Sequence, residues 1–485
     1  MFTELKPYPE LAAHNGVHSD VVPRHWTWRR IKSLTKLNPS RSEAREDIAS
    51  GAEATFLPME AVSSLGRVDY SRRIDPSMSA AGFTYFREGD VLVAKITPCF
   101  ENGKGACLEE LSTSFGLGST EFHVLRAGTE IAPKFLEAVT RTWRFRRLGA
   151  DAMTGSAGQQ RVPPEFIGSY AVALPPRAEQ EQIVTFLSHA NARIDQSIAA
   201  KRKMISLLEE QYQAFVSQSF TGGLDSGIPR TESGYPWIGD LPRHWDVLSC
   251  SRVVSLVTSG SRAWSDYYSD DGLIFIQSGN LGRSMELNLS RIQYVRPPQG
   301  AEGERTRVRR DDILVCITGA LTGNVVFVDQ DLNFPAFVNQ HVALVRPKPQ
   351  SVIPKFLALV LHSEIGRGQF KICEYGGTKQ GLGLADVKSI LVPIPPVSEQ
   401  QRILEDVAWE KDRIASLKHR AVAEIELLRE FRTRLTSDVV TGQLDVREAA
   451  SKLPDLDPAE LATADVDDSD AFNAVAEEFL DEDEP

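Results

Sequence analysis

The chain carries one segment twice, with the copies about 220 residues apart. Residues 171–225 align without a gap on residues 391–445. Both copies have Pro-Pro-x-x-Glu-Gln, at 175–180 and 395–400, and both end in Thr-Gly-x-Leu-Asp. The start of the unit is also repeated, as Pro-Arg-His-Trp at 23–26 and at 242–245. The chain is therefore expected to fold as one module used twice, which suits a target with two halves.

Composition places this duplicated chain among ordinary globular proteins. Its 485 residues are enough for two to four domains, and 42% are hydrophobic and 25% charged. No apolar run approaches the 18 residues of a membrane span, and the first 30 residues lack a signal-type stretch, so we expect a cytoplasmic protein without a membrane segment. The five cysteines are scattered, which argues for reduced thiols and against a zinc site or a disulfide framework.

The negative charge is concentrated at one end of the chain. The net charge is −12, but residues 451–485 alone hold 13 acidic residues and a single basic one. The rest of the chain carries 53 basic and 53 acidic residues. We expect residues 446–485 to be an acidic, disordered tail, and any basic surface on the neutral remainder to be local.

Outside the tail, the pattern predicts two mixed α/β globules. Residues 1–20 read as an irregular leader, followed by globules at 21–178 and 223–398. Short apolar runs predict buried strands, and segments with proline in the first turn predict helices. The predicted strands are 91–94, 122–125, 312–316 and 341–345, and the predicted helices are 133–147 and 354–367.

Two long helices are predicted to follow the globules. The stretches 177–221 and 397–441 contain no proline or glycine, and their apolar residues recur mostly every three or four positions. We expect long helices at 179–222 and 399–445, and helices of that length with one apolar stripe usually pair. The favoured architecture is therefore two α/β domains separated by an antiparallel coiled coil with pseudo-two-fold symmetry. The alternative is that each helix packs on its own globule.

The motifs of a catalytic subunit are missing from the sequence. An amino-methyltransferase needs an Asn/Asp-Pro-Pro-Tyr/Phe loop, and Leu174-Pro175-Pro176-Arg177 lacks both the polar residue and the aromatic. An ATP-driven motor needs G-x-x-x-x-G-K-[ST], which is absent, and no convincing carboxylate cluster suggests a nuclease. His25 and His244, in the repeated Pro-Arg-His-Trp turns, are better explained as structural residues than as catalytic ones.

Several stretches resemble the specificity (S) subunit of bacterial type I restriction-modification systems. They are residues 89–105, 118–126 and 235–245 and the two Pro-Pro-x-x-Glu-Gln motifs, and together they cover most of residues 22–445. The first copy lacks a counterpart of Tyr235-Pro236-Trp237-Ile238-Gly239. The two globules also differ from each other more than the two helices do, as readers of two different half-sites would.

The resemblance implies a role without catalysis. In this family each globule is a target-recognition domain that reads one half of a bipartite double-stranded DNA sequence. The long helices form the family's conserved regions, set the spacer and bind two methyltransferase (M) subunits, and restriction (R) subunits join through that core. No cofactor is then expected in this chain: S-adenosylmethionine belongs to the methyltransferase partner, and ATP with Mg²⁺ to the restriction partner. The competing interpretation is a coiled-coil assembly scaffold that does not read DNA.

Candidate DNA contacts are cationic, hydroxyl and amide side chains in loops and near strand ends. Lysine, arginine and serine suit phosphates, arginine also reads guanine, and asparagine or glutamine reads adenine. Matching glycine-rich loops at 155–161 and 376–381 precede the last strand of each globule, and glycine lets backbone N–H groups approach phosphate. The candidates are Lys95, Asn102, Lys104, Arg144, Ser156, Gln159, Gln160 and Arg161 in the first globule, and Arg262, Gln277, Ser278, Asn280, Thr378, Lys379 and Gln380 in the second.

Overall fold

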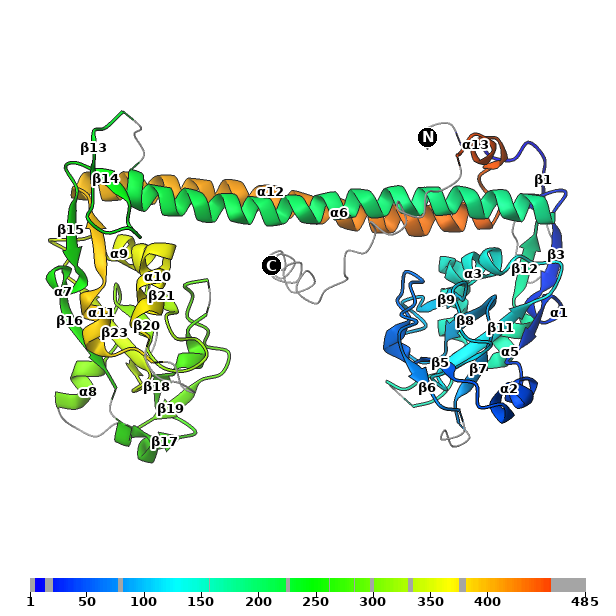
Figure 1. The fold of residues 1–485 in the computed structure, drawn as a ribbon, viewed down its shortest axis with the longest axis horizontal. Coiled ribbons are helices and arrows are strands. Elements are labelled where there is room, and N and C mark those ends of the chain that lie inside the picture. The colour runs from blue at the N-terminus through cyan, green and yellow to red at the C-terminus, as the bar shows by residue number, and fades with distance from the viewer. Residues whose placement is uncertain are drawn as a thin grey trace. The chain divides into compact units, whose positions relative to one another are not determined.

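The chain divides into two compact units, each of which contains an α/β domain and parts of both long helices. A computed structural model describes residues 5–13, 21–76, 82–156, 158–223, 227–260, 262–282, 284–296, 301–329, 335–374 and 381–454. Unit 1 comprises residues 1–202 and 421–485, and unit 2 comprises residues 203–420. Figure 1 shows the strands and short helices of each unit next to the helix segments that belong to it.

Unit 1 contains two four-stranded sheets and two shorter strand pairs. In the sheet β4-β11-β8-β9 all neighbours are antiparallel, and in β6-β5-β10-β7 only β5 and β10 run parallel. The remaining pairs are β1 with β2 and β3 with β12. The strands are β1 Leu11–Ala13, β2 Val21–Pro23, β3 Thr27–Arg30, β4 Thr35–Leu37, β5 Ala54–Leu57, β6 Arg73–Ile74, β7 Thr84–Phe86, β8 Asp90–Ala94, β9 Gly105–Cys107, β10 Gly116–Gly118, β11 Phe122–Ala127 and β12 Ala171–Leu174. The short helices are α1 Ile31–Leu34, η1 Arg41–Ala44, α2 Arg45–Ala49, η2 Met59–Ala61, α3 Pro133–Arg141, α4 Trp143–Asp151 and α5 Pro164–Ser169, and α13 Arg447–Ser451 follows the second long helix.

Unit 2 repeats this plan with small differences at the sheet edges. Its sheets are β16-β23-β20-β21 and β17-β19-β18-β22, accompanied by the pairs β13 with β14 and β15 with β24. The strands are β13 Arg230–Glu232, β14 Asp240–Pro242, β15 Asp246–Ser249, β16 Val254–Ser259, β17 Tyr268–Ser269, β18 Leu273–Ile276, β19 Gln293–Val295, β20 Ile313–Cys316, β21 Val325–Phe327, β22 Ala336–Val338, β23 Val342–Pro347 and β24 Leu391–Ile394. The helices are α7 Cys250–Val253, η3 Arg262–Tyr267, η4 Ser278–Asn280, α8 Ala301–Thr306, α9 Pro354–His362, α10 Glu364–Cys373 and α11 Leu384–Ser389.

A buried ion pair stabilises the same place in both antiparallel sheets. In unit 1 Arg126 donates two hydrogen bonds to Asp90, both 2.7 Å long. In unit 2 Arg346 donates two to Asp312, at 2.8 and 2.7 Å. Each aspartate side chain is about 1% exposed, so it depends on its bidentate arginine for solvation. The sheets, the helices and this matched ion pair together confirm the predicted mixed α/β fold and the internal repeat.

The two long helices are α6 Arg177–Gly222 and α12 Val397–Val440. Each is attached to its domain by the glutamine of the Pro-Pro-x-x-Glu-Gln motif. Gln180 is fully buried, accepts a hydrogen bond from the Ala132 amide (2.7 Å) and donates one to the Pro175 carbonyl (2.9 Å). Gln400 repeats both bonds in unit 2, with the amide of Ile353 at 2.8 Å and the Pro395 carbonyl at 2.9 Å. The motif therefore satisfies backbone groups where each helix begins.

The glutamate of the motif contacts the histidine of the repeated turn. Nε2 of His25 lies 2.7 Å from Oε2 of Glu179, and Nε2 of His244 lies 2.8 Å from Oε2 of Glu399. Glu179 also accepts hydrogen bonds from Tyr8 and from Trp26, which is buried. These contacts support the structural interpretation of the two histidines.

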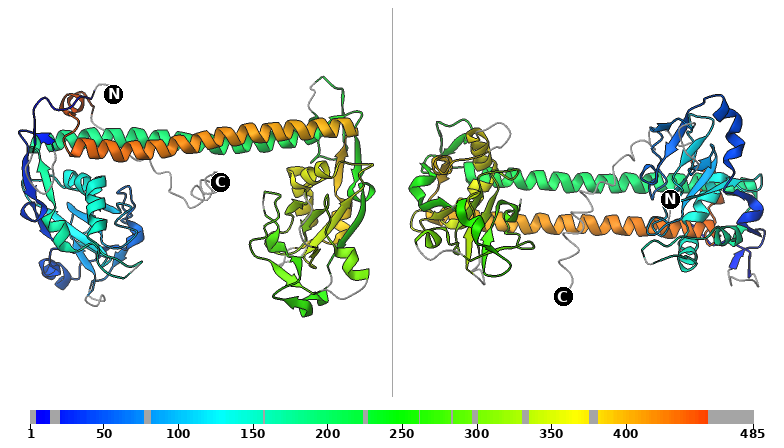
Figure 2. Two further views of the ribbon diagram at one scale, coloured as in Figure 1. Left: turned by 180° about the vertical axis from the view of Figure 1, so that it is seen from behind. Right: turned by 90° about the horizontal axis from the view of Figure 1, so that it is seen from below.

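Within each unit the two long helices lie side by side and run antiparallel. In unit 1 Asp195 pairs with Arg432 and Lys201 pairs with Glu424, so residue numbers rise along one helix as they fall along the other. In unit 2 Lys418 lies 3.0 Å from Glu209. Figure 2 shows the paired helix segments from two further directions. The predicted pairing of long helices is confirmed within each unit.

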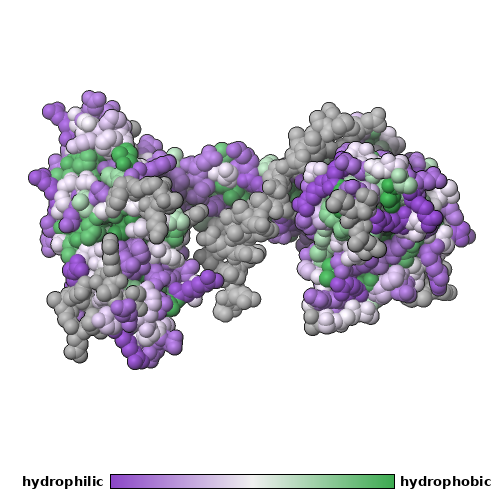
Figure 3. Space-filling view, turned by 60° about the horizontal axis from the view of Figure 1, so that its bottom comes forward, coloured by the Kyte–Doolittle hydropathy of each residue, from purple (hydrophilic) through white to green (hydrophobic). Residues whose placement is uncertain are grey.

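Each domain core includes side chains from both long helices. In unit 1, Ile183 and Phe186 of α6 and Val439 of α12 join the core that contains Phe135. In unit 2, Phe220 of α6 and Ile403 of α12 pack with Phe356. The apolar stripes predicted for the long helices therefore serve both helix pairing and attachment of the domains. The molecular surface drawn in Figure 3 is, by contrast, largely hydrophilic.

The structure differs from the sequence expectations at four places. Each helix expected at 133–147 and 354–367 is broken into two, because Thr142 and Ser363 bond the carbonyls of Val139 and Val360 with their hydroxyls. The leader expected to be irregular contains β1, and the first residues expected in the tail form α13, with Val446 and Ala450 buried. The disorder expected for 455–485 lies outside the described residues. None of the described helices combines the length and apolarity needed to cross a membrane.

Candidate nucleic-acid interface

The glycine-rich loop of unit 1 is held against the end of β8. The amide of Thr97 donates to the carbonyl of Gln160 (3.0 Å), and the amide of Val162 donates to the carbonyl of Lys95 (2.9 Å). The loop closes on itself through two backbone hydrogen bonds between Thr154 and Arg161, at 3.0 and 2.9 Å. Five predicted residues are thereby brought to one place: Lys95, Ser156, Gln159, Gln160 and Arg161.

Charge at this loop is partly neutralised. Arg161 makes a bidentate ion pair with Glu121, with Nη2 to Oε1 at 2.8 Å and Nε to Oε2 at 2.9 Å. That hydrogen bonding lowers the pKa of the Glu121 carboxyl, so the carboxylate stays charged. Lys95 donates to the carbonyl of Thr120 (2.7 Å), and burial lowers the pKa of its ammonium group. The loop thus presents one net positive charge with exposed Ser156 and Gln159 beside it.

The other predicted residues of unit 1 lie in the turn before β9 and on α4. Asn102 is exposed, whereas Lys104 is half-buried and donates from Nζ to the carbonyl of Met59 (3.2 Å). Arg144 is also half-buried and lies close enough to Tyr170 to counter part of the pKa rise that burial gives that tyrosine. Lys104 and Arg144 are therefore held partly by the domain itself.

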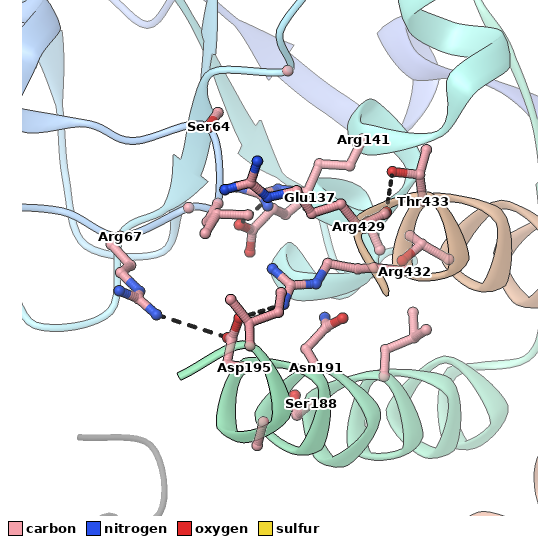
Figure 4. A pocket seen from close by; sticks show the side chains of 18 of the residues that line it. Ser64, Arg67, Glu137, Arg141, Ser188, Asn191, Asp195, Arg429, Arg432 and Thr433 are labelled. Atoms are coloured by element: carbon pink, nitrogen blue, oxygen red, sulfur yellow. Dashed lines mark hydrogen bonds and ion pairs between the residues drawn. The ribbon is translucent and has the colours of Figure 1, made fainter. Parts of the chain in front are cut away.

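Unit 1 also has a polar cavity of about 950 Å³ that sequence reasoning missed. Its walls come from the turns at 64–67 and 101–103, from α3 and α4, and from α6 and α12. In Figure 4, Arg67 and Arg432 both point toward Asp195, and Arg67 lies 3.8 Å from it. Among the predicted residues only Asn102 lines this cavity. The charged lining residues are Arg67, Lys134, Arg141, Arg146, Arg202, Arg429 and Arg432 against Glu101, Glu137, Asp195 and Glu426.

The cavity combines an excess of guanidinium groups with internal ion pairs. Arg141 lies 3.3 Å from Glu137 and donates to the carbonyl of Gly105 (2.8 Å). Burial, with Arg141 nearby, lowers the pKa of Arg146. The lining is suited to anions, and it offers ion pairs rather than a nucleophile with an adjacent base. No sequence signal was available, because the wall residues come from segments hundreds of positions apart.

In unit 2 the predicted residues Gln277, Ser278 and Asn280 lie in a tight turn after β18. The backbone N–H of Gln277 donates to Oδ1 of Asn280 (2.9 Å), and the backbone N–H of Asn280 donates to the backbone carbonyl of Gln277 (3.0 Å). Asn280 is 7% exposed, and its Nδ2 bonds the carbonyls of Asn288 and Arg291, both at 2.9 Å. The side-chain amide group of Asn280 is thus used in hydrogen bonds within the domain. Gln277 and Ser278, in contrast, are only half-buried.

The residues that follow the second glycine-rich loop are placed like those that follow the first. Leu382 donates from its amide to the carbonyl of Ile317 (2.8 Å), as Val162 does to Lys95 in unit 1. Thr318 and Gly381 form a bridge beside it. Three predicted residues, Thr378, Lys379 and Gln380, lie outside the described residues, as does the side chain of Arg262.

Two neighbouring tyrosines were missed by reasoning from the sequence. Tyr267 and Tyr268 are 40% and 45% exposed, and the hydroxyl of Tyr268 accepts a hydrogen bond from Nε2 of Gln277 at 3.1 Å. A signal was present, because the pair lies in the polar run Ser265-Asp266-Tyr267-Tyr268-Ser269-Asp270-Asp271. Aromatic residues in such a run tend to be exposed, and exposed aromatics are common at binding surfaces.

Comparison with known proteins relates this chain to one class of proteins. A family model described as type I restriction modification DNA specificity domain matches residues 301–413. The specificity subunit of the type I restriction enzyme EcoAI of Escherichia coli is 33% identical over 247 residues, which are 50% of this chain and 40% of that protein. The EcoEI specificity subunit of Escherichia coli is 33% identical over 177 residues, 36% of this chain and 29% of that protein. The chain thus spans less than half the length of these relatives.

Solved structures share the fold over nearly the whole chain. A chain from a type I R-M system has a TM-score of 0.63 at 19% identity and covers 87% of this chain and 99% of its own length. The HsdS subunit from Thermoanaerobacter tengcongensis has a TM-score of 0.53 at 18% identity and covers 88% of this chain and 99% of its own length. The chain thus shares its fold with these solved structures, and its residues 301–413 match the type I restriction modification DNA specificity domain.

Proposed function

We propose that this chain selects the DNA sequence on which a type I restriction-modification complex acts. Each α/β domain reads one half of a bipartite target. The paired helices set the spacer and bind two methyltransferase subunits, through which restriction subunits join. The chain has no catalytic step of its own: methyl transfer from S-adenosylmethionine and ATP-dependent work with Mg²⁺ belong to the partners. Its site of action is then the cytoplasm, where the DNA is.

One observation carries the proposal: the two units share an interior but present different surfaces at equivalent places. The ion pairs of Asp90 and Asp312 are matched, as are the helix attachments made by Gln180 and Gln400. The turn that follows the central parallel strand differs, since Pro58 precedes it in unit 1 and Gln277 in unit 2. A scaffold that only assembled proteins would have no need for two different surfaces on one framework.

Adenine methylation mapping across a genome tests this function. Cells express the cognate methyltransferase subunits with and without this chain, and methylated adenines are located by sequencing. The expected result is a bipartite motif with a fixed spacer that appears only when the chain is present. An assembled complex that produces no motif would contradict sequence reading and favour the scaffold alternative.

A further inference from the structure

Gln277 is held in one orientation by contacts on both sides. The turn after β18 fixes its backbone, because Asn280 bonds the Gln277 amide at 2.9 Å and is itself buried. The side chain is fixed separately by the bond from Nε2 to the hydroxyl of Tyr268, 3.1 Å away. A half-buried glutamine normally samples several rotamers, so two independent restraints reduce the entropy lost when it binds a partner.

Tyr268 is in turn anchored by an aromatic cluster. Its ring packs edge-on against Phe275 with centroids 5.8 Å apart, and Phe275 stacks on Trp264 at 5.6 Å. Phe275 and Trp264 are 1% and 2% exposed, so they form a rigid base for the half-exposed tyrosine. Tyr268 also begins β17, which pairs with β19 at the edge of its sheet (Figure 1). The hydroxyl therefore has a defined position beside Gln277.

The restrained amide keeps the groups that recognise one base. A glutamine amide has two N–H donors and an oxygen with two lone pairs, so one N–H on Tyr268 leaves a donor and an acceptor. In the major groove adenine offers N7 as an acceptor and the N6 amino group as a donor, and an amide side chain pairs with both. Guanine offers two acceptors on that edge and cannot satisfy the amide oxygen.

Resting on the function proposed above, the geometry points to Gln277 as the residue that reads an adenine in the half-site of unit 2, with Tyr268 as its positioning residue. The side chain of buried Asn280 donates a hydrogen bond to the backbone carbonyl of Arg291, so Asn280 fixes the backbone of both Gln277 and Arg291. Arg291 is exposed, and its cationic side chain is suited to contact a phosphate. Asn280, predicted as a contact, takes a structural role in this arrangement.

Unit 1 cannot read a base in the same way at the equivalent position. In unit 1 β5 runs parallel to β10, and in unit 2 β18 runs parallel to β22. Both β5 and β18 are followed by a one-turn 3₁₀ helix. The residue that precedes that helix in unit 1 is Pro58, which has no amide side chain. The described part of unit 1 also has β6 at the edge of this sheet, without a strand equivalent to β17. Changes at Gln277 should therefore alter one half-site only.

Selection from a pool of randomised DNA duplexes tests the inference. The full chain is purified together with its methyltransferase subunits, and bound duplexes are sequenced for the wild type and for Gln277→Glu, Tyr268→Phe and Tyr267→Phe. Glutamate only accepts hydrogen bonds and pairs with the N4 amino group of cytosine, so Gln277→Glu should replace one adenine by cytosine in one half-site. The loss of preference for adenine should be roughly 5- to 150-fold, the range of one bidentate base contact.

The tyrosine variants separate positioning from folding. Tyr268→Phe keeps the ring and removes only the hydroxyl, so it should reduce the preference at that same base pair several-fold and leave the other half-site and the spacer unchanged. Tyr267→Phe is the matched control at the neighbouring exposed tyrosine and should leave the motif as it is. In each experiment the other base pairs of the half-site read by unit 2 should keep their preferences, which shows that unit 2 of the variant is folded.

The possible failures are distinguishable. A wild-type complex that selects no motif overturns the proposed function, and this inference with it. A wild-type motif that Gln277→Glu leaves unchanged overturns the inference alone. A motif in which Tyr268→Phe and Tyr267→Phe weaken every position equally overturns the positioning role of Tyr268.

Discussion

Removing the glutamate of the helix motif should affect the two units very differently. In unit 1 Glu179 is 7% exposed and accepts hydrogen bonds from Tyr8 (2.7 Å) and Trp26 (3.1 Å), with His25 at 2.7 Å. In unit 2 the equivalent Glu399 is 14% exposed and pairs with His244, whose side chain is 42% exposed. We therefore compare Glu179→Ala with Glu399→Ala in the full chain.

The magnitude follows from the donors left without an acceptor. Glu179→Ala leaves two buried donors, the hydroxyl of Tyr8 and Nε1 of Trp26, without a hydrogen-bond acceptor. Each unsatisfied buried donor costs about 1–3 kcal/mol, so the free energy of unfolding of unit 1 should fall by about 2–6 kcal/mol. Glu399→Ala breaks one contact with a histidine that is partly exposed to solvent, and about 0–1 kcal/mol is typical of such a contact. Nε1 of Trp245 has no hydrogen-bond partner within the described residues before the change, so no new orphan appears there.

Amide hydrogen exchange measures each effect locally, without assuming two-state unfolding of a chain with two units. Exchange in β3, Thr27–Arg30, should accelerate roughly 30-fold or more in Glu179→Ala, since about 1.4 kcal/mol corresponds to a factor of ten. Exchange in β15, Asp246–Ser249, should change less than about fivefold in Glu399→Ala. If exchange in β3 and in β15 accelerated equally, the argument that unsatisfied donors make unit 1 more sensitive than unit 2 would be refuted.

Two further predictions concern His123 in unit 1 and the glycines near the ends of the two long helices. Burial lowers the pKa of His123 from 6.5 to about 4. Between these pH values the unfolded chain binds a proton at His123 that the folded chain does not. The free energy of unfolding should therefore fall as the pH drops through this window. Urea midpoints of unit 1 at pH 7 and pH 5 check this, and a His123→Phe variant with an undiminished pH response would contradict it. Gly442 has φ 74°, and a Cβ added there would lie 2.3 Å from Cδ of Pro23, whereas at Gly223, φ 65°, the nearest atom is 3.3 Å away in Trp245. Both alanine variants are strained, but Gly442→Ala should lower the thermal unfolding temperature further, and the reverse order would count against the steric argument.

The features that were predictable are those encoded over short distances. The apolar stripe through Ile183, Leu187 and Ile194 identified α6, because side chains three or four positions apart share a helix face. The repeated motif indicated where both long helices begin, within two residues. The breaks at Thr142 and Ser363 were missed, since a hydroxyl that bonds a carbonyl three residues back leaves the apolar spacing almost unchanged.

The candidate sites depended more strongly on long-range packing. Sequence spacing suggested that Asn280 and Gln277 had the same role, yet burial commits Asn280 to backbone carbonyls while Gln277 stays accessible. Tyr268 gained its importance from a hydrogen bond across nine positions and from rings that the sheet brings beneath it. The cavity around Asp195 joins turns, short helices and both long helices, and no local pattern records such a meeting.

The duplication, the long amphipathic helices and the absence of catalytic motifs can all be read from the chain alone, because repetition, periodicity and motif spacing are properties of a linear sequence. Which polar side chains are committed to the fold, and which face outward, is settled by the folded arrangement. That division depends on burial and on the partner each group finds, as when Glu179 accepts hydrogen bonds from Tyr8 and Trp26, more than 150 positions away. Hydrogen-bond donors and acceptors must be satisfied wherever the fold places them, and that placement is a property of the folded chain.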